Sequence, residues 1–334
     1  MIKNFVPAQP NLSKKSLQIA GSNLPYFRTQ EFDRMVGQIK TDIKELFNAK
    51  KHKVALLTAS GTGAMDCVLN NFLTDKDRVL VISVGRFGKR WVELCNFYNL
   101  KYDYVGSSLE VLRKKCVAFK PTVILMQHNE TSTMELLDIE AVGKICKANK
   151  IKLVVDASSS IGIDPLNIDS CSIDVLVAGT QKGLGTIAGL SVVVYNRSLK
   201  IVPKNYYLDL TKYKDSNDGL SLPFTPNIVA THQLAAQLTK FKTLGKDGLK
   251  QRIESIKRKK EYFYSLYKGP KLGTSSCGSI IVKNIVVKAV VEHLKKEGIY
   301  VCPSKGLDGR ELTIGHIGEL SYKDIRKLVG KIQR

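Results

Sequence analysis

The feature that most constrains the fold is a regular alternation of apolar runs and helical patterns between residues 53 and 200. The apolar runs have the length of β-strands and lie at 53–59, 78–83, 101–106, 122–127, 152–158, 173–179 and 189–196. Helical patterns follow several of them, beginning near residue 61 and covering about 87–98 and 138–150. This alternation predicts an α/β fold with a mostly parallel sheet covered by helices on both faces.

Polar side chains follow the ends of these predicted strands. They are Ser60, Thr62, His128, Asp156 and Thr180. Open α/β sheets bind ligands beyond the carboxyl ends of their strands. We therefore expect the functional site at this edge of the sheet.

The pattern changes after residue 200. An extended, polar and aromatic segment covers 206–226, and one long helix is predicted over about 229–268. Shorter strand and helix patterns then predict a small α+β unit. The predicted domains are an N-terminal segment packing with the small domain (1–20), a large cofactor-binding domain (21–240) and a small C-terminal domain (241–334).

The chain is strongly basic, with 52 Lys and Arg against 30 Asp and Glu and a net charge of +22. The basic residues are spread along the whole chain and no nucleic-acid motif accompanies them, so we expect no nucleic-acid partner. Seven scattered cysteines without a CxxC pair argue against disulfides or a metal site. Neither a signal peptide nor a membrane-spanning run is recognisable, which predicts a cytoplasmic protein with no membrane partner.

Two charged residues lie in neutral surroundings. Asp156 ends a fully apolar strand, where an ionised carboxylate needs a cationic partner or several donors. Lys182 lies in the small-residue stretch "VAGTQKGLGTIAGL". A partly desolvated lysine can lose its proton and act as an amine nucleophile.

A third element is the turn "SGTGAMDCV" after the first strand. Glycine N–H groups, two hydroxyls and a helix start make it a candidate phosphate cradle, although such a turn is most often only a helix start. It is not a Walker loop, because no Gly-Lys-Ser/Thr ends it. Lysine, carboxylate and anion site together match what pyridoxal 5′-phosphate requires: a Schiff-base amine, a partner for the ring nitrogen and a place for the phosphate.

The chain resembles the class V, fold type I pyridoxal-phosphate aminotransferases, in the branch of the alanine–glyoxylate and 2-aminoethylphosphonate–pyruvate enzymes. The block "VVDASSSIGIDPLNIDSCSIDVLVAGTQKGLG" is similar to that family's aspartate-to-lysine segment. The stretches "FRTQEF", "TASGTGAMDCVL", "GRFGKRWVEL", "HNETSTM", "LPFTP", "VCPSKG" and "IGHIGEL" resemble further family segments in the same order. The resemblance implies a homodimeric aminotransferase that uses amino-donor and carbonyl-acceptor substrates.

The resemblance also assigns roles to residues. It makes Lys182 the Schiff-base lysine and proton carrier, Asp156 the partner of the ring nitrogen and Phe87 the aromatic that stacks on the ring. Thr131 would contact the ring hydroxyl or a nearby edge. The phosphate would be held by Ser60, Gly61, Thr62, Gln181 and, from a partner chain, Thr225.

One position departs from the family. Thr313 occupies the place of the arginine that grips the substrate's carboxylate or phosphonate by a charged fork. His316 and Lys305 are the candidate substitutes. The departure predicts a changed substrate, such as a small phosphorylated, phosphonate or sugar-derived carbonyl compound.

Two alternatives to an aminotransferase remain at this point. One is a pyridoxal-phosphate lyase or cysteine desulfurase-like enzyme, for which Cys277 and Cys302 are the small-domain thiols; the desulfurases carry a histidine where this chain has Gln181. The other is a non-catalytic basic binding protein on the same scaffold. A binding protein would have no chemical need for both Lys182 and Asp156.

Overall fold

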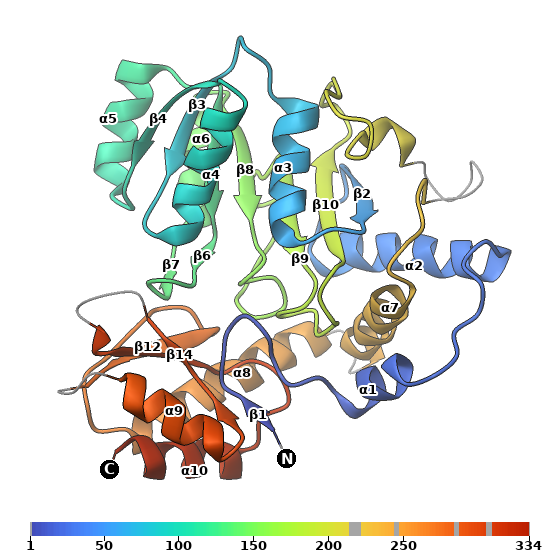
Figure 1. The fold of residues 1–334 in the computed structure, drawn as a ribbon. Coiled ribbons are helices and arrows are strands. Elements are labelled where there is room, and N and C mark those ends of the chain that lie inside the picture. The colour runs from blue at the N-terminus through green and yellow to red at the C-terminus, as the bar shows by residue number, and fades with distance from the viewer. Residues whose placement is uncertain (1, 214–221, 244–246, 284–286, 305–308, 334) are drawn as a thin grey trace.

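A seven-stranded sheet organises the larger part of the chain in the computed structural model, which describes residues 2–213, 222–243, 247–283, 287–304 and 309–333 (Figure 1). The strand order is β2-β10-β9-β8-β5-β3-β4. Six of these strands run parallel, and β10 is antiparallel to both β2 and β9. The strands are β2 (His52–Leu57), β3 (Arg78–Ile82), β4 (Lys101–Val105), β5 (Val123–Gln127), β8 (Lys152–Asp156), β9 (Val175–Gly179) and β10 (Ser191–Asn196). The predicted α/β fold and its mostly parallel sheet are confirmed.

Helices cover both faces of this sheet because its central strands are apolar on both sides. One face packs against α2 (Gln30–Leu46), α5 (Leu109–Phe119), α6 (Ile139–Ala148) and α7 (Ile228–Thr243). The other packs against α3 (Gly61–Phe72) and α4 (Arg86–Phe97). In β5, Leu125 faces α3 and α4 while Met126 faces the opposite core. The same alternation turns the last residues of β5 and β8, Gln127 and Asp156, toward α3 and α4.

A second, antiparallel sheet of order β11-β12-β15-β14 forms the smaller unit, together with α8, α9 and α10 (Figure 1). These elements are β11 (Lys271–Leu272), β12 (Gly278–Val282), β14 (Cys302–Pro303), β15 (Glu311–Gly315), α8 (Gly248–Leu266), α9 (Lys288–Lys296) and α10 (Tyr322–Ile332). No helix within the described ranges is both long and apolar enough to cross a bilayer.

The N-terminal segment contacts both units. Strand β1 (Lys3–Asn4) pairs in parallel with β13 (Ile299–Tyr300) of the small unit. Helix α1 (Lys14–Ala20) lies against α7, where the Gln233 amide donates to the Ser16 carbonyl oxygen at 2.8 Å. The domain boundaries at residues 20 and 240 stay predictions.

The helix predicted over 229–268 is two helices, α7 and α8. The described residues leave out 244–246, in the stretch "TLGKDG" between them. Its two glycines have low helix propensity, and an apolar pattern read across them gives no sign of the break. Two further short elements were not anticipated: the hairpin of β6 (Asn129–Glu130) and β7 (Glu135–Leu136), and a 3₁₀ turn, η1 (Leu210–Lys212).

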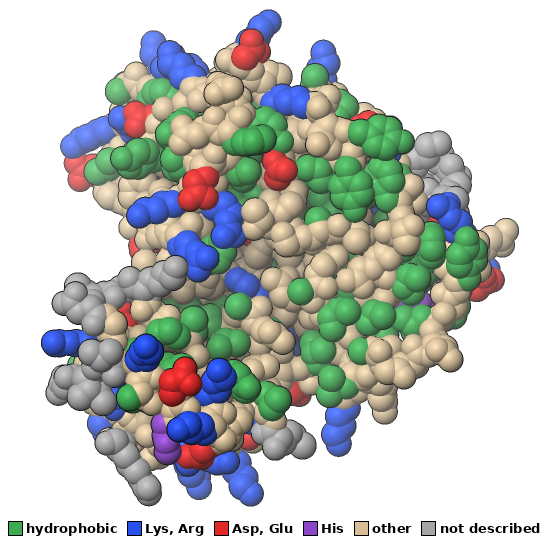
Figure 2. Space-filling model, in the orientation of Figure 1, with side chains coloured by type: hydrophobic (Ala, Val, Ile, Leu, Met, Phe, Trp, Pro, Cys, Tyr) green, Lys and Arg blue, Asp and Glu red, His purple; other side chains and the backbone are tan. Residues whose placement is uncertain are grey.

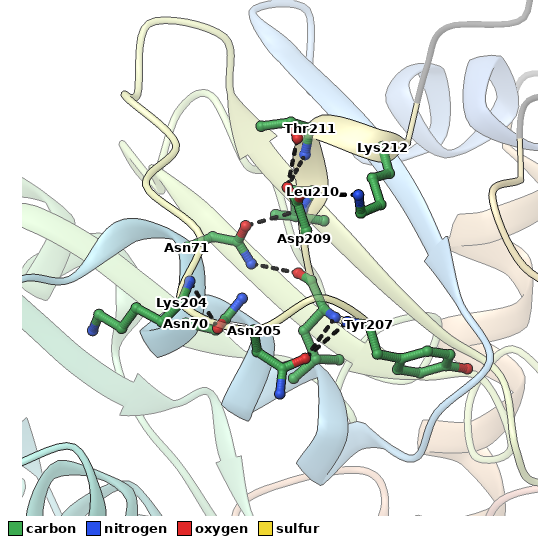
Figure 3. Close-up of polar contacts among 10 residues, drawn as sticks. Asn70, Asn71, Lys204, Asn205, Tyr207, Asp209, Leu210, Thr211 and Lys212 are labelled. Carbon is green, nitrogen blue, oxygen red and sulfur yellow. Dashed lines mark hydrogen bonds and ion pairs between the residues drawn. The ribbon is translucent and has the colours of Figure 1, made fainter.

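Two buried asparagines of α3 hold the segment that follows β10 (Figure 3). The Asn71 side chain donates to the Leu208 carbonyl oxygen at 2.7 Å and accepts from the Leu210 N–H at 3.0 Å. The Asn70 side-chain amide oxygen, Oδ1, accepts from the Lys204 backbone N–H at 3.2 Å. An irregular segment needs such partners for its buried backbone groups. These bonds fix the segment to the helix whose N-terminus begins at Gly61.

Candidate active site

The Lys182 side chain is buried just beyond the end of β9. Its Nζ donates to the Ser159 Oγ at 3.0 Å and lies 5.2 Å from the centroid of the Phe87 ring. Close packing requires the glycines around Lys182. A Cβ at position 183 would lie 1.9 Å from the Ile161 carbonyl oxygen, and Gly185 has a φ of +67°. The close packing holds one amine in a largely dry place.

Asp156 ends the neighbouring strand, β8, on the same side of the sheet. One carboxylate oxygen accepts from the Ser158 N–H at 2.9 Å. Burial raises the pKa of Asp156, while the Ser158 hydrogen bonds and the charge of Lys182 act in the opposite direction. A carboxylate that is desolvated in this way is stabilised by a cationic hydrogen-bond donor placed against it.

The N-terminus of α3 forms the predicted cradle. Ser60 caps the helix by accepting from the Gly63 N–H at 3.3 Å. A Cβ on Gly61 would lie 2.8 Å from the Ser158 Oγ, which itself accepts from the Gly179 N–H at 3.0 Å. Only glycine therefore fits here without a shift. The first-turn N–H groups of a helix have no intrahelical partner, so Gly61 and Thr62 present donors to an anion.

Glu130 positions Phe87, and sequence reasoning missed this residue. Its fully buried carboxylate accepts from the Phe87 and Gly88 N–H groups at 2.8 and 3.1 Å. The other oxygen accepts from the Ser132 hydroxyl at 2.6 Å and from its N–H at 3.0 Å. Glu130 thus joins the β6–β7 hairpin to the start of α4. A single glutamate in a loop carries no local pattern that would reveal this.

Three other predicted residues lie around these groups. Thr131 is buried directly after Glu130. Gln181 is half-buried beside Lys182, and a Cβ on Gly179 would lie 2.5 Å from its amide oxygen. The Thr225 carbonyl oxygen accepts from the Thr58 hydroxyl at 3.4 Å, two residues before the α3 cap. The roles of all nine predicted site residues stay predictions.

Buried polar atoms without a partner gather after β5, within the described part of the chain. They are both amide atoms of Gln127, Nδ1 of His128 and Oδ1 of Asn129. Burial lowers the pKa of His128 to about 4, so its imidazole is neutral near pH 7. Buried polar groups are seldom left unpaired. Gln127 lies opposite Asp156 in the pairing of β5 with β8, and the Asn129 amide donates to the Ser159 carbonyl oxygen, so these two amides indicate a place that a polar ligand completes. The His128 imidazole lies near the charge of Asp138 instead.

The small unit contributes Thr313 on β15. Its neighbours Leu312 and Ile314 pack into the core beneath α8 and α10, so the Thr313 side chain points to the opposite face of this sheet. It is 5% exposed and stands between Ile280 of β12 and Cys302 of β14. None of these side chains carries a charge.

Of the two candidate substitutes, the structure describes only His316, and this residue does not supply a charge. His316 is fully buried, and its Nε2 pairs with the Ser279 hydroxyl at 2.8 Å. Burial lowers the pKa of His316 to about 3, which leaves the ring neutral and unsuited to grip a carboxylate. Lys305 lies outside the described residues.

Cys277 lies near enough to Lys182 for that charge to act on its thiol. Burial nevertheless raises the pKa of Cys277 to about 12, so the sulfur stays protonated. A protonated and fully buried thiol is a poor nucleophile. This counts against Cys277 as a persulfide carrier.

Comparison with known proteins adds a family to this geometry. Residues 20–307 match the family described as Aminotransferase class-V. A soluble hydrogenase small subunit from Synechococcus sp. is 28% identical over 98% of this chain and 91% of its own length. The serine–glyoxylate aminotransferase of Methylorubrum extorquens is 26% identical over 95% of this chain and 86% of its own. An alanine–glyoxylate aminotransferase structure from Nostoc sp. superposes with a TM-score of 0.91 at 21% identity, covering 99% of this chain and 94% of that one.

Proposed function

Since the chain belongs to the class V aminotransferases, enzymes that use pyridoxal 5′-phosphate, we propose that Lys182 and Asp156 are the residues with which it works. In this proposal it moves an amino group between a donor and a small carbonyl acceptor. One observation carries this proposal. The buried Lys182 amine and the buried Asp156 carboxylate lie at the ends of the adjacent strands β9 and β8, beside the Phe87 ring and the N-terminus of α3.

The donor set fits the cofactor. The α3 cradle, where only glycine fits at position 61, suits a phosphate, and the Asp156 carboxylate suits a protonated ring nitrogen. The unpartnered Oδ1 of Asn129, whose Nδ2 donates to the Ser159 carbonyl oxygen at 3.1 Å, remains for the ring's polar edge. Bound pyridoxal phosphate supplies an electron sink for the substrate's Cα.

The chain's own groups would then divide the work. Lys182 would hold the cofactor covalently and would carry the substrate's proton on its Nζ. Asp156 would hold the proton on the ring nitrogen, and Phe87 would stack on the ring. Ser60, Gly61, Thr62 and Gln181 hold the phosphate, and Thr131 contacts the ring's edge. The buried setting keeps water from the reacting amine.

The substrate is proposed to lack the family's charged anchor. With Thr313 neutral among neutral neighbours, plain alanine, pyruvate and glyoxylate should bind poorly. Losing one partner of a buried charge pair costs about 2–5 kcal/mol, or roughly 30- to 4000-fold in affinity. The resemblance of the C-terminal motifs to the aminoethylphosphonate enzymes, with the net charge of +22, favours a phosphonate or phosphorylated compound.

Thr313→Arg tests this directly. The variant should raise kcat/KM for the alanine–pyruvate pair by at least about tenfold, because it adds a cation where the family binds carboxylates. The measurement is a donor and acceptor screen that follows loss of the visible absorbance of the bound cofactor. Thr313→Gln, which adds length without charge, is the matched control. A wild-type enzyme with a submillimolar KM for alanine would show that another group already grips the carboxylate.

The enzyme is further proposed to be a homodimer. Tyr206 and Tyr207 are 74% and 41% exposed, and Phe224 stacks on Tyr207 with ring centroids 4.9 Å apart. Figure 2 shows hydrophobic side chains gathered on this part of the surface. The Tyr207 hydroxyl also donates to the Thr58 carbonyl oxygen at 3.1 Å, so the aromatic patch borders the cradle. A second copy seated here would bring its own Thr225 toward the phosphate site.

Light scattering at micromolar protein should give twice the mass of the chain. Tyr206→Glu should shift the protein toward the monomer and weaken cofactor retention, because it places a charge in the apolar patch. Val117→Glu is the matched control, since Val117 is 73% exposed on α5, which covers the opposite face of the sheet from α3. A fully active wild-type monomer would overturn the dimer and the role of Thr225.

A further inference from the structure

A phosphate needs compensation of its charge, yet the residues expected to hold it are neutral. A phosphate monoester carries about −1.5 to −2 charges near pH 7. Ser60, Gly61, Thr62 and Gln181 offer hydrogen bonds and a helix N-terminus, which alone is equivalent to roughly half a charge. A cation beside the cradle would supply charge compensation that the motif itself does not include.

Arg90 of α4 lies in the position that such a cation would need. Its Nη1 donates to the Thr62 Oγ at 2.9 Å, and its guanidinium carbon lies 4.8 Å from the centroid of the Phe87 ring. No carboxylate forms an ion pair with Arg90 among the residues that the structure describes. Its charge is thus available to an anion bound at the start of α3.

The direction of the hydrogen bond adds a second effect. Arginine can only donate, so the Thr62 oxygen accepts from Arg90 and its own O–H proton must point elsewhere. A bound phosphate then meets the hydroxyl as a donor. A cationic partner strengthens such a bond, and neighbouring hydrogen bonds polarise each other.

We propose that Arg90 is the positioning cation of the phosphate site: it orients the Thr62 hydroxyl as a donor and neutralises part of the phosphate's charge. The inference rests on the proposed function, because it takes the α3 cradle as the place of the cofactor's phosphate. The competing role is mechanical. Arg90 packs on Phe87, and it could serve only to hold that ring.

Two ligands separate these roles, since pyridoxal lacks the phosphate but keeps the ring and the aldehyde. Cofactor-free protein is titrated with pyridoxal phosphate and with pyridoxal, and the dissociation constants are read from absorbance. Arg90→Gln should weaken binding of pyridoxal phosphate by about 10- to 100-fold, the range for a lost hydrogen bond from a charged group. Binding of pyridoxal should change by less than about threefold. Arg90→Lys keeps the charge but loses the planar fork of donors. It should weaken binding of pyridoxal phosphate, but less than Arg90→Gln does.

Two more variants complete the experiment. Thr62→Val should also weaken binding of pyridoxal phosphate more than binding of pyridoxal. The double variant should lose less binding free energy than the sum of the two single variants, because both residues act on the same phosphate. Lys89→Gln, which removes an exposed charge from the next position of α4, should change neither constant. Melting curves verify that each variant is folded.

The outcomes are distinct. Equal weakening of both ligands by Arg90→Gln would assign Arg90 to the Phe87 ring and overturn the proposal. Unchanged binding of pyridoxal phosphate would overturn it as well. If wild-type protein bound neither ligand, the failure would lie with the proposed function instead.

Discussion

Lys182→Ala should give a colourless, folded protein that does not transaminate. The wild-type protein should be yellow if the buried amine, as proposed, attaches the cofactor covalently. Without that amine the cofactor has no covalent anchor and the substrate's proton has no carrier. Removing a group with such a double role lowers kcat by roughly 10⁴-fold or more. Absorbance spectra with single-turnover assays measure both losses.

Two control variants isolate the role of the amine. Lys182→Arg keeps a cation in the pocket but cannot form the covalent link, so it should also be colourless. Ser159→Ala removes only the hydrogen bond to Nζ and should retain colour and most activity. Near-normal turnover of Lys182→Ala would show that another group is the anchor.

Asp156→Asn should separate catalysis from stability. The amide cannot hold a proton on the ring nitrogen, so kcat should fall by about 100- to 1000-fold, the usual effect of losing one preorganised electrostatic partner. The covalent attachment at Lys182 and its colour should remain. Because burial raises the pKa of Asp156, the ionised carboxylate destabilises the folded chain near pH 7 when no cationic partner is bound.

The cofactor-free Asp156→Asn variant should therefore melt at the same temperature as cofactor-free wild type or above it. Cofactor binding should raise the melting temperature of the variant by less than that of wild type, since the variant lacks the charge opposite the ring nitrogen. Calorimetry of both forms gives the comparison. Unchanged kinetics would count against the role, and a lower melting temperature without cofactor would mean that Asp156 stabilises the empty fold.

The strands were predictable because their signal is local. The seven apolar runs enclose β2 and β10 as well as the central strands, apart from His52 at the start of β2. Burial on both faces removes polar residues from such segments. The break between α7 and α8 was not predictable from periodicity, because the apolar pattern continues across it.

The site residues also divide into those that the local sequence reveals and those that it does not. Lys182 and Asp156 are recognisable because each is a charge in neutral surroundings. Phe87 and Thr131 could be named only through the family resemblance, since an aromatic and a loop hydroxyl are common everywhere. Glu130 and Arg90 were missed, because their importance comes from contacts with residues 42 and 28 positions away in the chain.

The carboxylate of Glu130 also bears on which helix N-terminus is free to bind the cofactor's phosphate. Two helices, α3 and α4, begin at the site, and each N-terminus attracts anions. At α4 the Phe87 and Gly88 donors are already taken by Glu130, a built-in anion that does not leave. In the proposed site a phosphate would therefore bind at α3. Glu130 would in this way leave the N-terminus of α3, rather than that of α4, open to the cofactor's phosphate.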